Sequence, residues 1–239
     1  PRSRGLGDVY KRQVNNLFEI SANLASQVEV IKGPSSAMFG GNSLHGLINI
    51  KSLEPKDTND IYFQIDKNES LRSRVLLRNS SNTLLGVELD RDKGFRNQTG
   101  FDQQKMVIKN YGSFRDWSLQ TLINFTNLNQ ETAGYIDSYF HPTRIINVNP
   151  EAYRDAKSLR IKTEISKNLD ALDISLIPYI RFSSMNFIQH YLPGQPVEKN
   201  GQKSAGLFFN LLGFKVNNNF FGIGSQIEFA HVNFCLLYT

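Results

Sequence analysis

Apolar and polar side chains alternate along most of this chain, and this two-residue period constrains the fold more than any other feature of the sequence. In the stretch 115–128, for example, one face of an extended strand carries Trp117, Leu119, Ile123 and Phe125. The opposite face carries serine, glutamine, asparagine and threonine. Successive side chains of a β-strand point to opposite faces of its sheet. The period therefore predicts strands with one apolar and one polar face, and little helix.

Nine segments of this kind follow one another, separated by polar turns, and we expect a mainly β fold. Their predicted ranges are 60–66, 71–78, 83–91, 103–111, 115–128, 157–166, 171–186, 204–216 and 220–233. The polar face includes many charged side chains, among them Arg72, Arg74, Glu88, Arg160, Glu164 and Arg181. Two folds alternate in this way, a water-soluble antiparallel β-sandwich and a transmembrane antiparallel β-barrel.

The lengths of the strands and of their connections favour the barrel. Several predicted strands reach ~10 or more residues, as a tilted membrane crossing requires, whereas strands of soluble proteins average ~5 to 6 residues. Long connections at 92–102, 129–156 and 187–203 alternate with tight turns, as in outer-membrane barrels. Single-chain bacterial barrels close with an even number of strands, so we expect about nine strands of a larger barrel. A soluble β-sandwich that binds a ligand stays open as the alternative.

The overall charge of the chain carries little information about its partners. The net charge is +5 over 239 residues. Residues 1–13 and 235–239 resemble translated sequencing adapter, and we expect both to be artefacts. Four basic residues and one acidic residue lie in 1–13, so the rest of the chain has a formal charge of only +2. The basic balance is therefore no argument for a nucleic-acid partner, and we expect none.

No catalytic or metal-binding constellation can be assembled from the sequence, and we expect neither an enzyme nor a cofactor. The four histidines show no paired spacing such as H-x-x-x-H. The only cysteine, Cys235, lies in the second expected artefact, which leaves no thiolate metal site. No nucleophile stands with a base and an orienting group. The glycine-rich stretch 33–46 lacks the patterns of the common phosphate-binding loops.

The most specific motif is VEVIKGPSSAMFGGNSLHGLINIKS, at residues 28–52. Its apolar residues predict two short strands on either side of a glycine-rich loop. Pro34 has no N–H group for a ladder, so we expect the first strand to end at Gly33 and Pro34.

This motif resembles the end of the plug domain of TonB-dependent outer-membrane receptors. In that family a strand of the form VExIEVxxGP is followed by SSAxxG, a turn with glycine and a GxINI strand. The matching residues are Val28, Glu29, Val30, Ile31, Gly33, Pro34, Ser35, Ser36, Ala37, Gly40, Gly46, Ile48, Asn49 and Ile50. Lys32 stands where arginine is more usual, and lysine lacks the bidentate fork of arginine.

The resemblance implies a division of the chain and a transport function. Residues 14–56 would be the C-terminal part of an α/β plug domain inside the barrel. Residues 57–234 would be the N-terminal strands of a barrel that the family builds from about 22 strands. The implied function is active uptake of a metal chelate, above all a ferric siderophore, across the bacterial outer membrane. Cobalamin, haem and oligosaccharides stay open as other ligands within the family.

The resemblance also implies partners and sites. The partners would be TonB, through a segment outside this sequence, the chelate, and outer-membrane lipid. We expect the charged face of the strands to meet the plug, with Glu29 and Lys32 as the plug groups that contact it. In the outer loops, aromatic rings and cations suit a bulky, partly anionic chelate. The candidate ligand-binding residues there are Tyr135, Tyr139, His141, Arg144, His190 and Tyr191.

Overall fold

The computed structural model describes most of the chain and forms two antiparallel sheets. The described residues are 18–33, 46–55, 59–67, 69–79, 82–132, 146–169, 172–188, 192–216 and 219–238, with the side chains of 214–216 and 219–220 excepted. Among the described residues, no helix has the length and the apolar character needed to cross a membrane.

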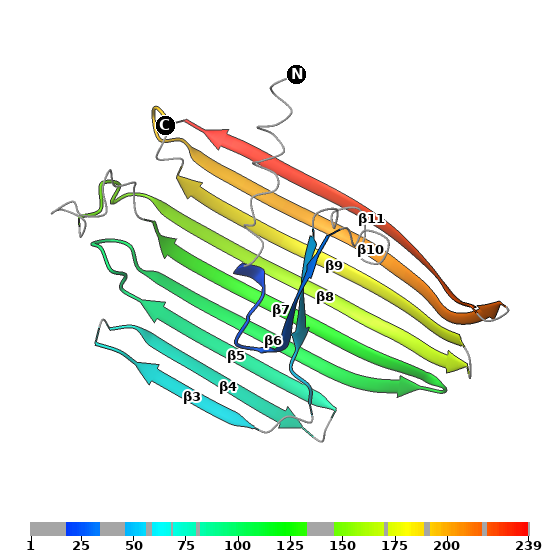
Figure 1. Ribbon diagram of the computed structural model, residues 1–239. Coiled ribbons are helices and arrows are strands. Elements are labelled where there is room, and N and C mark those ends of the chain that lie inside the picture. The colour runs from blue at the N-terminus through cyan, green and yellow to red at the C-terminus, as the bar shows by residue number, and fades with distance from the viewer. Residues whose placement is uncertain are drawn as a thin grey trace.

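The large sheet contains nine antiparallel strands in the order of the chain (Figure 1). They are β3 (Asp60–Ile65), β4 (Leu71–Asn79), β5 (Thr83–Asp92), β6 (Phe101–Phe114), β7 (Trp117–Glu131), β8 (Tyr153–Leu169), β9 (Leu172–Ile188), β10 (Val197–Val216) and β11 (Asn219–Leu237). Each strand pairs with the one before it, so the sheet is a continuous meander. All nine predicted strands are present, and the expectation of a mainly β, antiparallel fold is confirmed.

Several strands are longer than the sequence predicts. β8 begins at Tyr153 rather than 157, and β10 begins at Val197 rather than 204. β11 continues to Leu237, which pairs with Val197. The added stretches are polar or irregular in pattern, but their backbone groups continue the hydrogen-bonded ladder. Hydrogen bonding between strands does not require alternating side chains. The two-residue alternation therefore marks only the part of each strand that has one apolar and one polar face.

Short and long connections alternate along the large sheet. At one end of the strands, the chain needs two or three residues to pass from β4 to β5, β6 to β7, β8 to β9 and β10 to β11. At the other end, the chain needs between five and 21 residues to pass from β3 to β4, β5 to β6, β7 to β8 and β9 to β10. This is the alternation that the sequence predicts.

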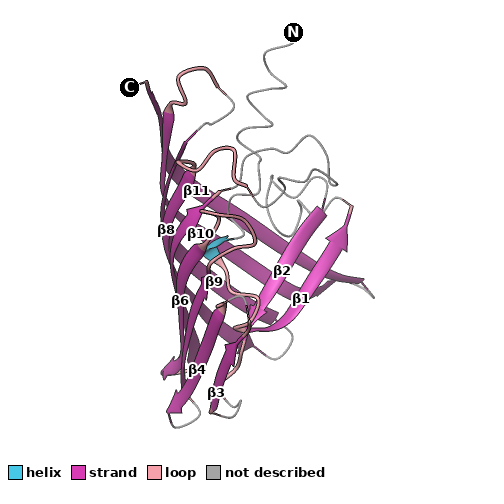
Figure 2. Ribbon diagram, turned by 90° about the vertical axis from the view of Figure 1, so that its left-hand side faces the viewer, coloured by secondary structure: helices cyan, strands magenta, loops and turns pink. Residues whose placement is uncertain are grey.

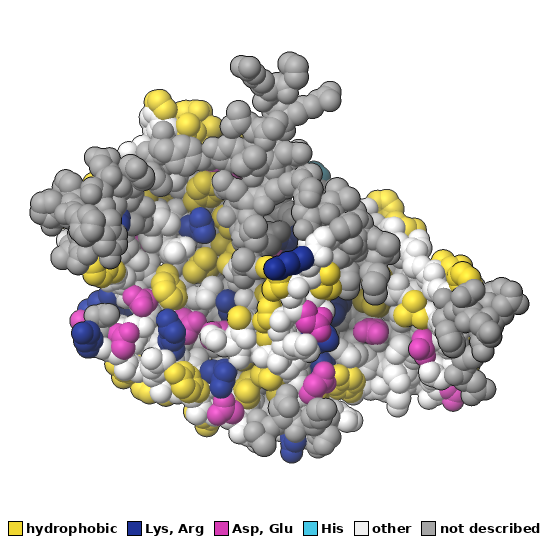
Figure 3. All heavy atoms as spheres, in the orientation of Figure 1, with side chains coloured by type: hydrophobic (Ala, Val, Ile, Leu, Met, Phe, Trp, Pro, Cys, Tyr) yellow, Lys and Arg dark blue, Asp and Glu magenta, His cyan; other side chains and the backbone are white. Residues whose placement is uncertain are grey.

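The two faces of the large sheet differ in what they contact. One face, here called the outer face, leaves large apolar side chains exposed, and these include Ile61, Phe63, Ile65, Leu77, Leu89, Phe125, Ile180, Phe182, Leu207, Phe209, Ile223, Ile227 and Phe229. The other face, here called the inner face, is covered in part by residues 18–33 and 46–55, which together form the inner segment. Figure 2 shows the inner segment on one side of the sheet. In the orientation of Figure 1, basic and acidic side chains are mixed on this face (Figure 3).

The inner segment ends in a two-stranded hairpin of β1 (Ala25–Lys32) and β2 (Gly46–Ser52). β1 ends at Lys32, and Gly33 follows with φ of 94°. Gly46 has φ of 145°, and a Cβ at this position would lie 2.8 Å from the Ile31 carbonyl oxygen. Only glycine accepts this conformation and this close approach, which allows β2 to pair with β1 from its first residue.

The apolar core lies between the inner segment and the inner face. Leu24 packs with Leu76 and Val107, which belong to β4 and β6. A second cluster joins Leu128, Ala156 and Met185 from β7, β8 and β9, and Phe18 of the inner segment packs against it. Phe101 and Phe187 also pack against this second cluster. Burial therefore fixes the segment before β1 against the sheet at two points.

Candidate functional site

The contact between the inner segment and the inner face includes three buried or partly buried polar anchors, and the first is Glu19. Its side chain is fully buried. Arg181 donates from Nε to Oε2 at 3.1 Å and from Nη2 to Oε1 at 2.6 Å, which is a bidentate pair. Arg160 places its Nε 2.5 Å from Oε2. One carboxylate of the inner segment thus holds two arginines of the sheet.

The register of the sheet explains why this carboxylate is needed. Arg160 on β8 and Arg181 on β9 are direct partners across the two strands. Like charges directly opposite each other destabilise a sheet. Glu19 lies between them and provides the opposite charge, so the inner segment stabilises a charge pair that the sheet alone leaves unfavourable.

The second anchor is Glu88 on β5. Ser21 Oγ and Asn23 Nδ2 donate to its two carboxylate oxygens. Arg74 and Lys105 are the direct strand partners of Glu88 on either side. Glu88 as a whole residue is only 3% exposed. It is therefore buried between these two cations and the inner segment.

The same two cations also hold the backbone of the inner segment. Lys105 Nζ donates to the Ile20 carbonyl oxygen at 3.0 Å, and Arg74 Nη1 donates to the Asn23 carbonyl oxygen at 3.1 Å. These carbonyl groups lie outside regular structure and have no ladder partner, so the two side chains provide one. The irregular stretch before β1 is therefore hydrogen-bonded by sheet side chains.

The third anchor is Glu54, which follows β2. Lys109 Nζ lies 2.8 Å from Glu54 Oε1, and the Tyr111 hydroxyl donates to Oε2 at 2.5 Å. The Lys109 side chain is only 3% exposed. Its ammonium group is therefore nearly buried and depends on this carboxylate, because a buried charge without a partner is costly.

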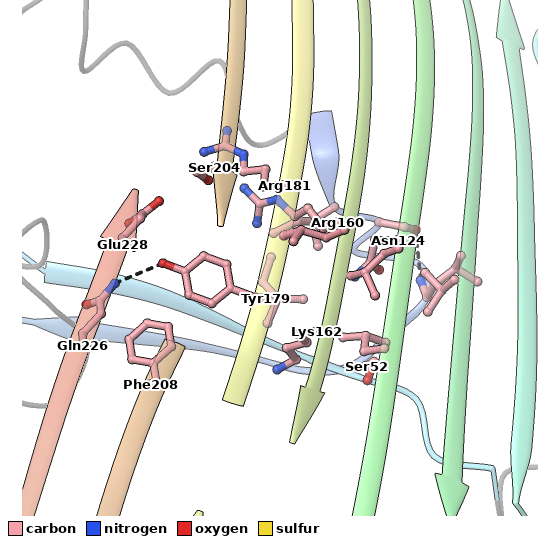
Figure 4. A pocket seen from close by; sticks show the side chains of 18 residues that line it. Ser52, Asn124, Arg160, Lys162, Tyr179, Arg181, Ser204, Phe208, Gln226 and Glu228 are labelled. Carbon is pink, nitrogen blue, oxygen red and sulfur yellow. Dashed lines mark hydrogen bonds between the residues drawn. The ribbon is translucent and has the colours of Figure 1, made fainter. Parts of the chain in front are cut away.

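A cavity of about 390 Å³ lies beside the first anchor, between the inner segment and strands β6 to β11 (Figure 4). Ile20, Leu24 and Ile50 line it from the inner segment. The sheet contributes Arg160, Lys162, Tyr179, Arg181, Ser204, Phe208, Gln226 and Glu228, among others. The anchor arginines are thus shared between the contact and the cavity.

The predicted plug residues that the structure describes lie within the hairpin and not against the sheet. Glu29 accepts hydrogen bonds from Lys51 Nζ at 2.6 Å and from Asn49 Nδ2 at 2.9 Å. These bonds, that from Lys51 first, lower the pKa of Glu29 below its ordinary value. Lys32 is exposed at the end of β1, and the described part of the chain shows no ion pair for it. Within the described part of the inner segment, the charged side chains that form ion pairs with the inner face are Glu19 and Glu54.

The six charged residues of the strands that we expect to meet the plug divide into two groups. Four of them, Arg74, Glu88, Arg160 and Arg181, contact the inner segment as described above. Arg72 is the strand partner of Asp90 and lines a smaller cavity of about 170 Å³. Glu164 lies four residues after Arg160 on β8 and on the same face of the sheet.

Other predicted residues lie outside the described part of the chain. These are Pro34, Ser35, Ser36 and Gly40 of the motif, and all six loop residues, Tyr135, Tyr139, His141, Arg144, His190 and Tyr191. Their roles stay predictions. Within the described ranges, no group of three histidine, cysteine or acidic residues is placed to hold a metal ion.

Sequence reasoning missed Glu19, Ser21, Asn23 and Glu54. These residues stand before and after the hairpin, where no period marks a strand. A usable signal was present on the sheet side, because arginines and lysines on one polar face of neighbouring strands require carboxylates from elsewhere.

Comparison with protein-family models and with curated proteins gives no match. Solved structures do match. The siderophore receptor PiuA from Acinetobacter baumannii has a TM-score of 0.71 at 12% identity, over 88% of this chain and 36% of that chain. The ferric-catecholate import receptor Fiu from E. coli K12, in its closed form, has a TM-score of 0.67 at 15% identity, over 86% of this chain and 36% of that chain.

The ferric yersiniabactin uptake receptor FyuA from Yersinia pestis matches with a TM-score of 0.62 at 15% identity, over 87% of this chain and 37% of that chain. The chain has the fold of a partial TonB-dependent receptor barrel. It spans about a third of the length of these receptors. The receptor fold confirms the expected partial antiparallel barrel, and it does not identify a ligand.

Proposed function

We propose that this chain is part of a TonB-dependent receptor that takes up a metal chelate across the bacterial outer membrane. In this proposal the inner segment is the end of the plug domain, β3 to β11 are the first barrel strands, and the outer face contacts lipid. The observation that carries the proposal is the contact between the inner segment and the inner face. Its ion pairs and hydrogen bonds join two parts of one chain across the inside of a receptor-type sheet.

The polar contact between the inner segment and the inner face suits a plug that must move. An apolar contact that buried the same area would lose its stabilisation when the two surfaces separated and became exposed to water. Ion pairs and hydrogen bonds exchange part of their protein partners for water, which bridges such groups at modest cost. Among the residues that the structure describes, the apolar packing of the inner segment on the sheet forms two small clusters, one at Leu24 and one at Phe18. The anchors therefore hold the segment in a defined place without a continuous apolar core.

A ferric siderophore is the ligand class we propose, and TonB is the proposed energy-coupling partner. Support comes from the names of the structural neighbours, which are a siderophore receptor, a ferric-catecholate import receptor and a ferric yersiniabactin uptake receptor. Cobalamin, haem and oligosaccharides are the competing ligands within the family. A soluble β-sandwich is the competing class, and the exposed apolar outer face argues against it.

The first experiment tests uptake. A receptor-deleted bacterial strain would carry the complete gene that encodes this chain and would grow on single iron sources. We expect growth on at least one ferric siderophore, and loss of that growth when TonB is deleted. Growth that does not depend on TonB would contradict the proposal.

The second experiment tests whether the inner segment must move. Leu24→Cys and Gly86→Cys are introduced together in the complete receptor, with any other cysteine replaced by serine. A Cβ at position 86 would lie 3.0 Å from a Leu24 methyl carbon, so the two thiols come within reach of each other. We expect oxidation to stop uptake and a reductant to restore it, while each single cysteine variant transports under both conditions. Full uptake with the disulfide formed would contradict a moving plug.

A further inference from the structure

The cavity beside the Glu19 anchor has the volume and the walls of a binding site. Its volume of about 390 Å³ falls in the range of pockets that hold small ligands, ~300 to 1,000 Å³. Its described walls come from the inner segment and from strands β6 to β11. The lining residues named here are different from the candidate ligand-binding residues that the sequence places in the loops.

The charges around the cavity leave a positive excess. Three cations, Arg160, Lys162 and Arg181, line it. Glu19 pairs with both arginines, and Glu228 lines the cavity on the β11 side. Lys162 forms no ion pair within the described part of the chain. Its ammonium group is thus a free cation at the wall, on the side away from β11 (Figure 4).

The cavity also has a flat apolar wall. The rings of Tyr179 and Phe208 lie 5.3 Å apart at an interplanar angle of 31°. Tyr179 lies across its strand partner Gly206, where a Cβ would stand 2.5 Å from the ring carbon Cζ. Glycine at 206 therefore makes room for the ring to lean across β10. There the ring meets Phe208, and the Tyr179 hydroxyl accepts a hydrogen bond from Gln226 Nε2 at 3.3 Å.

A buried hydroxyl group adds an independent sign of a ligand. Ser204 lines the cavity, and its residue is 6% exposed. Its Oγ has no hydrogen-bond partner among the described residues. A buried polar group without a partner is uncommon in native proteins and calls for an explanation. Ser204 is the strand partner of Arg181, so this hydroxyl stands beside the guanidinium group that the anion would approach.

We propose that this cavity binds an anionic group attached to an aromatic ring, such as a phenolate or an aromatic carboxylate. The anion meets Lys162 and the Arg181 side of the wall, the Ser204 hydroxyl donates to it, and the ring packs on Tyr179 and Phe208. A role for this site in transport through the barrel rests on the proposed function. The binding of such an anion in the cavity rests on the cavity alone.

Isothermal titration calorimetry with 2-hydroxybenzoate, on the protein purified in detergent micelles, tests the site. We expect Lys162→Gln to weaken binding at least 10-fold, because it removes the unpaired cation and keeps a polar side chain. Lys162 is exposed, so the fold should tolerate the change. Lys157→Gln is the matched control, since it removes an exposed lysine from the other face of the same strand, and it should bind like the parent.

A second variant and a second probe keep the inference open to refutation. Ser204→Ala should weaken binding about threefold without changing the charge. Benzylamine, which has the same ring with a cation, should not bind. The proposal is overturned if Lys162→Gln and Lys157→Gln bind 2-hydroxybenzoate equally, or if benzylamine binds as tightly.

Binding and uptake separate the two proposals. If 2-hydroxybenzoate binds as expected but the complete receptor imports no chelate, the cavity site stands and the proposed function fails. If the receptor imports a chelate and the purified protein does not bind the probe, the cavity site alone fails.

Discussion

Glu19 shows how one residue can set the position of a whole segment. Glu19→Gln removes the charge that Arg160 and Arg181 share, and it leaves two like charges opposite each other on neighbouring strands. Breaking a buried pair in this way costs about 3 to 5 kcal/mol. We expect the lower end of this range, because the Arg160 side chain is 32% exposed. Denaturant unfolding would measure the loss, and hydrogen exchange would locate it at residues 18–24.

The control for this change is Glu69→Gln. Glu69 pairs with Lys93, and both side chains are more than half exposed. Exposed pairs contribute at most about 1 kcal/mol, so this variant should unfold nearly like the parent. If the two variants lose equal stability, Glu19 is not an anchor.

The Glu29 carboxylate is expected to make the stability of the hairpin depend on pH. Its pKa in the folded protein lies below its ordinary value, because Lys51 and Asn49 donate to its carboxylate. Because the folded pKa is lowered, the pair with Lys51 stabilises the folded hairpin fully at pH values above the ordinary glutamate pKa of about 4.3. This stabilisation is lost as the pH falls through the folded pKa. NMR titration of the Glu29 carboxyl carbon should show the low value, and Lys51→Met should raise it. An unchanged pKa in that variant would contradict the assignment.

At the scale of the element, the stretch before β1 is held by packing as well as by charge. Leu24 is 2% exposed and packs against Leu76 and Val107. Leu24→Ala should destabilise the docked segment by about 2 to 5 kcal/mol, since it removes buried methyl groups and leaves a cavity. Val30→Ala is the control, because Val30 is 65% exposed and its loss should change stability by about 0.5 kcal/mol or less. Thermal unfolding followed by circular dichroism would measure both, and equal effects would contradict this packing.

Glycine at two positions decides how the elements fit together. Gly86 on β5 leaves room for the Leu24 side chain, whose methyl carbon would stand 3.0 Å from a Cβ at 86. Gly206 on β10 leaves room for the Tyr179 ring in the same way. In both cases a small residue on one strand accepts a large side chain from another part of the fold.

At the scale of the whole molecule, the single tryptophan allows a test of the proposal that the outer face contacts lipid. Trp117 lies at the start of β7, on the same face as the exposed Phe125, and Lys167 Nζ lies 5.8 Å from its ring centroid. Aromatic residues at strand ends gather at the membrane interface of such barrels. In bilayers with brominated lipids, we expect bromine near the headgroups to quench Trp117 fluorescence more than bromine deep in the chains.

Two further variants, both made in a Trp117→Phe background, separate the faces. Phe125→Trp places the tryptophan on the outer face in mid-strand and should be quenched by deep bromine. Asn124→Trp places it next to the cavity on the inner face and should be quenched little. Equal quenching of the two would show that the outer face does not meet lipid.

The sequence by itself determined the large sheet. Period-two alternation requires only local backbone geometry, so nine strands, their order and the alternation of short and long connections could be predicted. The apolar outer face and the charged inner face also follow from this period. For the same reason, the sequence could place Arg160, Arg181 and Glu88 on the inner face.

Only the tertiary structure decided which groups those charges meet. Glu29 belongs to the most recognisable motif, yet it pairs within its own hairpin, while Glu19 and Glu54 stand in unpatterned stretches and meet the sheet. The cavity likewise depends on Gly206, Tyr179 and Ser204, which lie on two strands and meet through register. Contacts between residues as distant as 19 and 181 depend on how one segment docks against another. No periodicity along the chain records that docking, because it is set by the summed packing and charge of both surfaces.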